Sequence, residues 1–183
     1  VPRPGALMNL REARARAKRV RAAVFDVDGI LTDGSLLLAD AGDETKAFNT
    51  RDGHGLRMLQ DAGIVLAILT GRRSSVVELR ARDLGIAHVL QGAKDKREGL
   101  ADLVARTGVP AEAMSYMGDD VVDLPALTVC AFAATVPEAP AIVRAHAHWI
   151  TAAPGGRGAI REVSEFILSA QGRLAARWTP FLA

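Results

Sequence analysis

The sequence predicts an α/β fold of the doubly wound type, with a mostly parallel, Rossmann-like sheet and helices on both faces. Two observations carry this prediction. Short stretches that are apolar throughout alternate along the 183 residues with longer stretches of helical character, which is the pattern of parallel strands buried on both faces. In addition, polar side chains gather directly after several apolar stretches, where open parallel sheets bind their ligands.

The strands are recognised as short apolar runs bounded by polar or glycine-containing segments. They are predicted, in chain order, at 22–26, 64–71, 88–92, 114–118, 129–134 and 147–150. After the first strand, "SLLLAD" and "ETKAFN" are expected to pair as an inserted β-hairpin that turns at Ala41, Gly42 and Asp43, because glycine beside aspartate suits a tight turn.

The helices fill the intervals between the strands. They are predicted at 9–18, 52–63, 74–84, 94–107, 121–127, 138–145 and 160–173. Gly85 and Gly108 stand where the third and fourth of these helices should end, and glycine is the residue that most readily adopts the left-handed conformation found after a helix.

The composition excludes several classes of function. A net charge of +2 and an aromatic content of 4% leave few stacking platforms for bases, so nucleic acid is not expected as a partner. The basic run at 10–21 is interpreted as a solvated helix face. No apolar stretch approaches the roughly 20 residues that span a bilayer. Cys130 is the only cysteine, so no disulfides and a cytoplasmic location are expected, without membrane contact.

Carboxylates, a hydroxyl and a lysine lie after the predicted strands or near them. Asp26 and Asp28 follow the first strand, Thr70 lies near the end of the second, and Asp119 follows the fourth. Aspartate oxygens favour Mg²⁺, which also binds phosphate oxygens. One carboxylate can then attack phosphorus, while another protonates the leaving oxygen and later activates water. With Thr70 and Lys96 as donors to the phosphoryl group, the set predicts a metal-dependent reaction at a phosphate ester.

Other motifs favour ordinary structure. "DVDGILTDG" looks like a calcium loop, but Ile30 stands where a ligand is required and the segment follows a strand rather than a helix. His146 and His148 have no third metal ligand nearby in the sequence. Cys130, in an apolar run, is expected to be a buried and inert thiol. The glycines of "GGRG" (155–158) form no dinucleotide fingerprint, and we consider this segment as a flexible gate over the site.

In their order along the chain, "DVDG" (26–29), "LTG" (69–71), Lys96 and "GDDVVD" (118–123) resemble the four signatures of haloacid dehalogenase superfamily phosphatases. The resemblance implies that Asp26 is the nucleophile and a metal ligand. It implies that Asp28 is the acid/base and binds the metal through its backbone carbonyl, and that Thr70 and Lys96 hold the phosphoryl group.

The last signature supplies the remaining acidic residues of the expected site. By the same resemblance, Asp119 is a metal ligand, and Asp120 and Asp123 support the site from behind. The presence of Asp28 favours a phosphatase or phosphomutase over a dehalogenase, and the lack of a cap domain disfavours the phosphomutase.

The spacing leaves no room for a cap domain, because the segments between the signatures are too short. One capless domain is therefore expected over 1–183, with 1–8 as a loose leader or cloning remnant and 154–183 as a C-terminal loop and helix. Since this chemistry benefits from excluding bulk water, a closed ring of subunits is expected, in which each hairpin contributes to a neighbour's site. A capless branch of the superfamily forms homotetramers of this kind.

Longer segments, such as "KAFNTRDGHGLRML" and "GGRGAIREV", resemble the members of that branch that remove the 8-phosphate from a 3-deoxy-octulosonate sugar acid for lipopolysaccharide synthesis. The resemblance covers about 20–170 and implies Mg²⁺ as cofactor, with Mn²⁺ or Co²⁺ as substitutes. It implies substrate contacts at Asp28, Asn49, Thr50, Arg51, Asp52, Gly53, Arg57, Arg72, Arg80 and Lys96. The arginines make independent sense, because their planar forks suit the carboxylate of a sugar-acid phosphate.

Two other functions stay open at this stage. Phosphatases of nonulosonate 9-phosphates, in pathways of the sialic-acid type, share the same motifs. A non-catalytic regulatory module is the alternative from a different class. The complete set of Asp26, Asp28, Thr70, Lys96 and Asp119 argues against it, because a binding module needs no pairing of a nucleophile with an acid.

Overall fold

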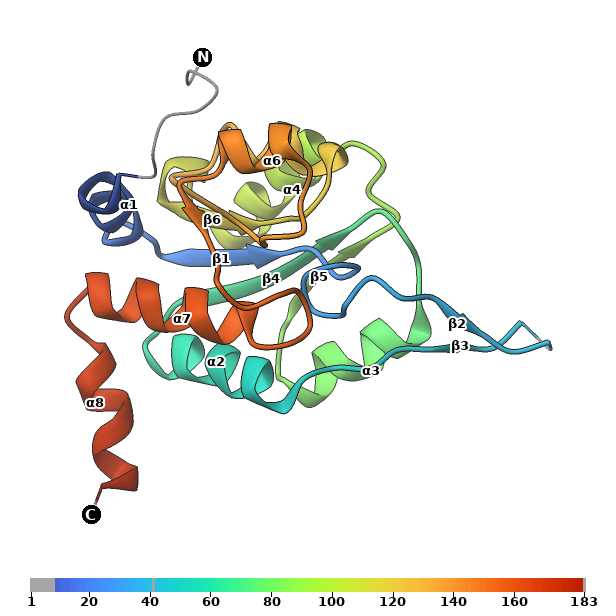
Figure 1. Cartoon of the computed structure of the whole chain (residues 1–183), viewed down its shortest axis with the longest axis horizontal. Helices are drawn as coiled ribbons and strands as arrows, with labels where there is room; N and C mark the ends of the chain where they lie inside the picture. Colours follow the sequence, from blue (N-terminus) through green and yellow to red (C-terminus); the bar gives the residue numbers. More distant parts are fainter. Residues whose placement is uncertain (1–8, 41, 183) are drawn as a thin grey trace.

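The computed structural model describes residues 9–40 and 42–182. Its centre is a parallel sheet of six strands in the order β5-β4-β1-β6-β7-β8 (Figure 1). The strands span Ala22–Phe25 (β1), Val65–Thr70 (β4), His88–Gln91 (β5), Met114–Met117 (β6), Phe132–Thr135 (β7) and Trp149–Ile150 (β8). The doubly wound α/β fold predicted from the sequence is confirmed.

Helices cover both faces of this sheet. They span Leu10–Ala17 (α1), Thr50–Asp61 (α2), Ser75–Asp83 (α3), Lys96–Thr107 (α4), Leu124–Leu127 (α5), Ala141–His146 (α6), Ala159–Ala170 (α7) and Leu174–Trp178 (α8). In Figure 1, α2, α3 and α7 lie below the sheet, and α4 and α6 lie above it. All four residues of β1 are buried between these layers, so the first strand enters the protein interior just before its polar continuation.

Side-chain caps fix where the functionally important helices begin. The Asn49 Oδ1 accepts hydrogen bonds from the backbone N–H groups of Arg51 and Asp52 at the start of α2. The Asp95 carboxylate does the same for Arg97 and Glu98 at the start of α4. Because such caps satisfy N–H groups that have no partner within the helix, they define the first residue of each helix; in α4 this residue is Lys96.

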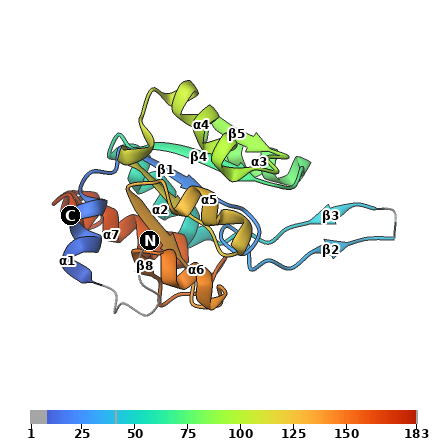
Figure 2. The ribbon, with the colours of Figure 1, turned by 90° about the horizontal axis from the view of Figure 1, so that it is seen from above.

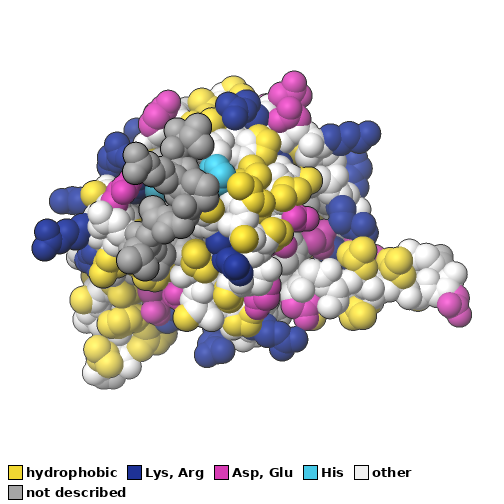
Figure 3. All heavy atoms as spheres, turned by 45° about the horizontal axis from the view of Figure 1, so that its top comes forward, with side chains coloured by type: hydrophobic (Ala, Val, Ile, Leu, Met, Phe, Trp, Pro, Cys, Tyr) yellow, Lys and Arg dark blue, Asp and Glu magenta, His cyan; other side chains and the backbone are white. Residues whose placement is uncertain are grey.

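A two-stranded hairpin projects from the body of the protein between β1 and α2 (Figure 2). Its strands are β2 (Leu37–Leu38) and β3 (Glu44–Thr45), paired antiparallel. The hairpin predicted from the sequence is thus present, although only two residues pair on each side; Ala41 of the predicted turn lies outside the described residues. Leu36, Leu37 and Leu38 are 46%, 53% and 64% exposed, and hydrophobic side chains are visible on the hairpin in Figure 3.

Several element boundaries differ from those predicted, and three of the differences have a clear local cause. The strand expected at 129–134 begins only at Phe132, because the Ala131 N–H donates to the carbonyls of Ala111 and Met114 and belongs to the preceding turn. The segment at 121–127 starts as a 3₁₀ turn (Val121–Asp123) before α5. The helix expected at 138–145 begins after Pro140, since proline has no N–H to donate within the helix.

At the C-terminus, α8 and a 3₁₀ turn (Thr179–Phe181) follow α7 and were not predicted. The expected leader at 1–8 lies outside the described residues. No helix in the described ranges has the length and apolar character to cross a membrane.

Candidate active site

The carboxyl ends of β1, β4 and β6 meet at one edge of the sheet and open into a cavity of about 440 Å³. The strand register aligns Phe25 with Ile68 and Met117, so the residues that follow lie side by side. Seven predicted site residues line this cavity: Asp26, Asp28, Thr70, Arg72, Lys96, Asp119 and Asp120. The structure thus brings together residues that are up to about ninety positions apart in the sequence.

Asp26 follows β1 directly and is 7% exposed. Its Oδ1 accepts a hydrogen bond from the Val27 N–H at 2.7 Å, and its Oδ2 lies 3.0 Å from the Lys96 Nζ. Burial and then repulsion from Asp123 raise the pKa of Asp26 to about 6, despite the opposing effect of Lys96. These two contacts fix the orientation of the Asp26 carboxylate, with its Oδ2 toward the Lys96 ammonium group.

Lys96 is almost completely buried and has well-defined partners. Its Nζ donates to the Leu69 carbonyl at 2.9 Å, the Tyr116 hydroxyl at 3.0 Å and the Asp123 Oδ1 at 2.9 Å. A buried ammonium is costly unless it is paired and hydrogen-bonded, and here both conditions are met. The charge of Lys96 is thus fixed at the floor of the cavity beside Asp26.

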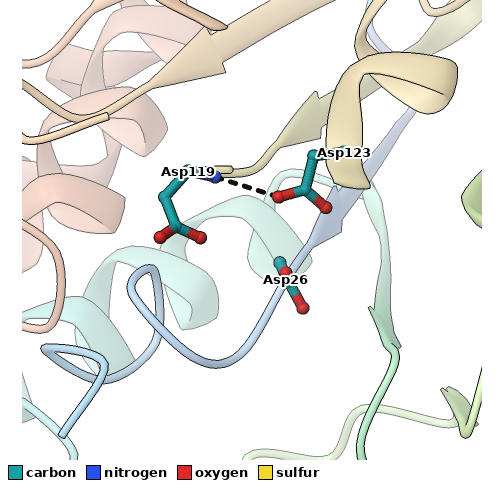
Figure 4. A group of neighbouring side chains, drawn as sticks. All are labelled: Asp26, Asp119 and Asp123. Carbon is teal, nitrogen blue, oxygen red and sulfur yellow. Dashed lines mark hydrogen bonds between the residues drawn. The ribbon is translucent and has the colours of Figure 1, made fainter. Parts of the chain in front are cut away.

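Asp123 organises the loop after β6. Its Oδ1 accepts hydrogen bonds from Lys96 and from the Tyr116 hydroxyl, the latter at 2.6 Å. Its Oδ2 accepts from the N–H group of Asp119 at 3.1 Å (Figure 4) and from that of Asp120 at 3.2 Å. Carboxylate oxygens of Asp26, Asp119 and Asp123 lie within 4.8 Å of one another. Because four donors already occupy the oxygens of Asp123, it fits a supporting role better than that of a metal ligand.

Asp119 is available to bind a cation. Burial, followed by repulsion from Asp123 and Asp26, raises its pKa to about 7, and no Lys or Arg of the described residues forms an ion pair with it. Its carboxylate lies against Gly29, where a Cβ would stand 2.2 Å from Oδ2. Glycine therefore leaves room for this carboxylate next to Asp26. Two neighbouring hard oxygen ligands, of which Asp119 has no cationic partner among the described residues, fit a magnesium site.

Asp28 is surrounded by charged side chains, one of which the sequence analysis missed. Its Oδ1 lies 2.5 Å from the Nζ of Lys46, and its Oδ2 lies 3.5 Å from the Nε of Arg72. Glu44 in turn pairs with both cations. Lys46 lies 18 positions from Asp28, beyond the hairpin, and only the folding of that hairpin places it there. The "ETKAFN" segment itself gave no signal beyond strand character.

None of the substrate-contact residues expected on α2 and α3 lines the cavity. Asp52 is 1% exposed, and its carboxylate accepts hydrogen bonds from the N–H groups of Gly158 and Arg161 at the start of α7. Burial raises its pKa. Arg80 pairs with Asp83 at 2.6 Å. The predicted contacts that lie outside the cavity are Asn49, Thr50, Arg51, Asp52, Gly53, Arg57 and Arg80.

The "GGRG" segment packs against the loop that follows Asp28. The Gly156 N–H donates to the Ile30 carbonyl at 2.9 Å, and a Cβ on Gly155 would stand 1.8 Å from the Gly29 carbonyl oxygen. Only glycine permits this approach. This segment therefore supports the backbone that carries Asp28.

The lone thiol and the paired histidines have structural surroundings. Cys130 is buried, as predicted, and burial raises the pKa of its thiol to about 12, so the thiolate needed for reactivity does not form near neutral pH. The Nδ1 of His148 accepts a hydrogen bond from the Ala133 N–H, and burial lowers its pKa to about 4. His146 contacts the Ile142 carbonyl of its own helix.

Comparisons with known proteins agree with this geometry. The 3-deoxy-D-manno-octulosonate 8-phosphate phosphatase KdsC of Yersinia pestis is 42% identical over 159 residues, which cover 87% of this chain and 85% of that protein. The Moraxella catarrhalis phosphatase of the same name, solved with magnesium ion, phosphate ion and KDO, matches with a TM-score of 0.92 and 42% identity, over 94% of this chain and 99% of that one. The cobalt-bound Haemophilus influenzae protein matches with a TM-score of 0.88 and 39% identity, over 92% and 99%. No family model matches the chain.

Proposed function

The chain belongs to the 3-deoxy-D-manno-octulosonate 8-phosphate phosphatases of the haloacid dehalogenase superfamily, and we propose that Asp26 and Asp28 carry out its reaction. It is a phosphoric monoester hydrolase that releases phosphate from this sugar acid with the help of a divalent metal ion. The observation that supports the residue assignment is the meeting of Asp26, Lys96 and Asp119 in one cavity, with Asp28 beside them.

The reaction proceeds in two steps at phosphorus. A carboxylate oxygen of Asp26 forms a bond to phosphorus while the bond from phosphorus to the sugar oxygen breaks, and Asp28 gives its proton to that leaving oxygen. Water then attacks the phosphorus of the aspartyl phosphate and gives a proton to Asp28, while the bond between phosphorus and the Asp26 oxygen breaks. Inorganic phosphate leaves, and both carboxyl groups return to their starting states.

Thr70 and Lys96 hold the phosphoryl group during these steps. Thr70 ends β4 and is 2% exposed, so its hydroxyl stands at the cavity wall. Lys96 already contacts the Asp26 carboxylate at 3.0 Å, and its fixed charge offsets the negative charge that gathers on the phosphoryl oxygens. Since both side chains are held before substrate arrives, little reorganisation is needed.

The carboxylates of Asp26 and Asp119 and the backbone carbonyl of Asp28 would hold the metal ion. When bound, it lowers the repulsion between Asp26 and the anionic phosphoryl group. Asp123 orients the backbone of the loop that carries Asp119 and Asp120. Mg²⁺ suits these oxygen ligands, and Mn²⁺ and Co²⁺ are expected to substitute for it.

The carboxylate end of the substrate is bound by arginines from more than one copy of the chain. Arg72 lines the cavity, whereas Arg80 and the contacts expected on α2 do not. A homotetramer with shared active sites accounts for both observations, because a neighbouring copy brings its own α2 and α3 surface to the open side. The exposed leucines of the hairpin supply apolar area for that contact.

We infer that this capless domain acts in the cytoplasm, in the synthesis of lipopolysaccharide precursors. The "GGRG" segment acts as a gate over the cavity only if the hydrogen bond from the Gly156 N–H to the Ile30 carbonyl opens. A phosphatase of nonulosonate 9-phosphates shares the same catalytic residues and differs in the wall that meets the sugar acid. A regulatory module without activity has no use for a carboxylate pair next to a metal site.

Phosphate release from a panel of sugar phosphates tests this function. The wild-type protein and Asp26→Asn are assayed with Mg²⁺, Mn²⁺, Co²⁺ and a chelator. We expect metal-dependent release that is fastest on the octulosonate 8-phosphate and falls to background in Asp26→Asn. Faster release from the nonulosonate 9-phosphate would change the substrate but retain the mechanism. No release from any member of the panel would overturn the proposal.

A further inference from the structure

The hairpin that projects into solvent carries one lysine that does not face solvent. The side chain of Lys46, just after β3, is 1% exposed, and its Nζ lies 2.5 Å from the Asp28 Oδ1 and 3.3 Å from the Glu44 Oε1. Burying a long, flexible ammonium side chain is unfavourable in both solvation and conformational entropy unless charged partners offset it. Two carboxylates do so here, and the geometry of Lys46 is fixed as a result.

Lys46 lies behind Asp28 rather than in the cavity. The cavity is lined by Asp28 and Arg72 but not by Lys46. Arg72 is 48% exposed; it lies 3.5 Å from the other oxygen of Asp28 and 3.1 Å from the Glu44 Oε1. Lys46 is far less accessible. Of the two cations at Asp28, Arg72 is half-exposed at the cavity wall and Lys46 is buried behind Asp28.

We propose that Lys46 is a positioning residue that orients the carboxyl group of Asp28 for proton transfer to the leaving sugar oxygen. By holding Oδ1, it prevents rotation of the carboxyl group and leaves Oδ2 facing the cavity. The proton that is donated as the phosphorus–oxygen bond breaks comes from the oriented carboxyl group of Asp28. The attacking water later replaces this proton. This inference rests on the role of Asp28 in the proposed function.

The simpler interpretation is that Lys46 only neutralises Asp28 and Glu44 and thereby stabilises the hairpin. The two interpretations differ in which substrates are affected by its removal. A sugar alkoxide is a poor leaving group that needs a proton, whereas p-nitrophenolate leaves without one. The constant kcat/KM reports the steps up to the departure of the leaving group. Loss of positioning therefore lowers kcat/KM for the sugar phosphate selectively, and a general disturbance of the site lowers it for both substrates.

The test compares Lys46→Met with the wild-type protein on the octulosonate 8-phosphate and on p-nitrophenyl phosphate, with saturating Mg²⁺. We expect kcat/KM for the sugar phosphate to fall about 10- to 100-fold, within the range of acid–base catalysis, and kcat/KM for p-nitrophenyl phosphate to change less than about threefold. A burst of p-nitrophenolate should also appear, because the second step still needs an oriented Asp28. Lys18→Met, on the exposed end of α1, is the matched control and should leave both values unchanged.

Two further variants keep the test decisive. Lys46→Arg retains the charge with a different shape, so it should fold even if Lys46→Met does not, and it should show the same substrate selectivity in weaker form. In an Asp28→Asn background, Lys46→Met should cause no further loss, because the group that it orients is gone. Equal losses on both substrates, or additive losses in the double variant, would overturn the inference while leaving the function intact. Absence of sugar-phosphate hydrolysis in the wild type would instead overturn the proposed function.

Discussion

Two carboxyl groups in the cavity have pKa values that are raised into the physiological range. These raised pKa values determine how the stability of the metal-free protein depends on pH. The pKa of Asp26 is raised to about 6 and that of Asp119 to about 7, in both cases mainly by burial and then by neighbouring carboxylates. The native state therefore binds protons that the unfolded chain releases. In the metal-free protein, this contribution to stability is present at low pH and is lost as the pH rises through about 6 to 7.

Metal affinity should show the opposite dependence on pH, because the ion binds the deprotonated carboxylates. We expect the dissociation constant of Mg²⁺ to rise by roughly tenfold per pH unit below about pH 7 and more steeply below about pH 6, as one and then two protons compete. Isothermal titration calorimetry at pH 8, 7, 6 and 5.5 measures this. An affinity that is constant over this range would contradict the assignment of Asp26 and Asp119 as ligands.

Removing the charge of Asp123 should mainly lower the stability of the fold, because Asp123 is not expected to be a metal ligand. Asp123 is fully buried and accepts four hydrogen bonds, including those of Lys96 and Tyr116. Breaking a buried ion pair on one side costs about 3–5 kcal/mol, so Asp123→Asn should lower the free energy of unfolding by about 3 kcal/mol in urea denaturation. The exposed pair of Asp102 and Arg106 provides the control: Asp102→Asn should cost at most about 0.5 kcal/mol. Similar losses in both variants would contradict this account.

At the scale of elements, the loop that carries Asp28 depends on a double glycine in the segment before α7. Gly156 and Gly172 both have φ near +65 to +70°. A Cβ added to Gly156 would lie 2.4 Å from a backbone carbon of Thr32, whereas a Cβ added to Gly172 would meet no other atom within 4 Å. Alanine at either position costs about 1–2 kcal/mol for the left-handed backbone. Only Gly156→Ala must in addition move the loop after β1.

We therefore expect Gly156→Ala to lose roughly 2 kcal/mol more stability than Gly172→Ala and to lower kcat at least tenfold, while Gly172→Ala keeps its activity. Thermal unfolding and phosphate release on the two purified variants measure both effects. If the two variants behave alike, the contact between this segment and the Asp28 loop has no functional importance.

The elements show what could be predicted from sequence and what could not. All six strands were expected near their observed positions, because parallel strands buried on both faces are apolar throughout. The start of β7 was misplaced, since Cys130 and Ala131 are as apolar as the strand but belong to a turn. The contact of Lys46 with Asp28 was missed because it forms across the hairpin between residues that share no periodicity. The capping of α7 by Asp52 escaped prediction for the same reason, its partners lying more than a hundred residues away.

At the scale of the whole molecule, the proposed homotetramer assigns the exposed hairpin and the open side of the cavity to contacts between copies of the chain. The hairpin has two short strands and exposed leucines, and an isolated hairpin of this size is only marginally stable in water. We therefore expect the assembly of subunits to depend on contacts made by the hairpin. We expect Leu37→Asp with Leu38→Asp to convert the oligomer to monomers in analytical ultracentrifugation and to raise KM for the sugar-acid phosphate. An unchanged sedimentation coefficient would show that the hairpin is not the contact.

The proposal of shared active sites makes a sharper prediction about two variants, each of which is expected to be inactive. Asp26→Asn removes the nucleophile, and Arg80→Ala removes an arginine that lies outside the cavity of its own chain. In hybrids of the two, co-expressed with different tags and purified through both, a site that combines Asp26 of one copy with Arg80 of its neighbour is intact. Random assembly in equal amounts restores about a quarter of the wild-type activity. If Arg80 acted within its own chain, no site would be complete and the hybrids would remain as inactive as their parents; recovered activity therefore requires that neighbouring copies build each site together.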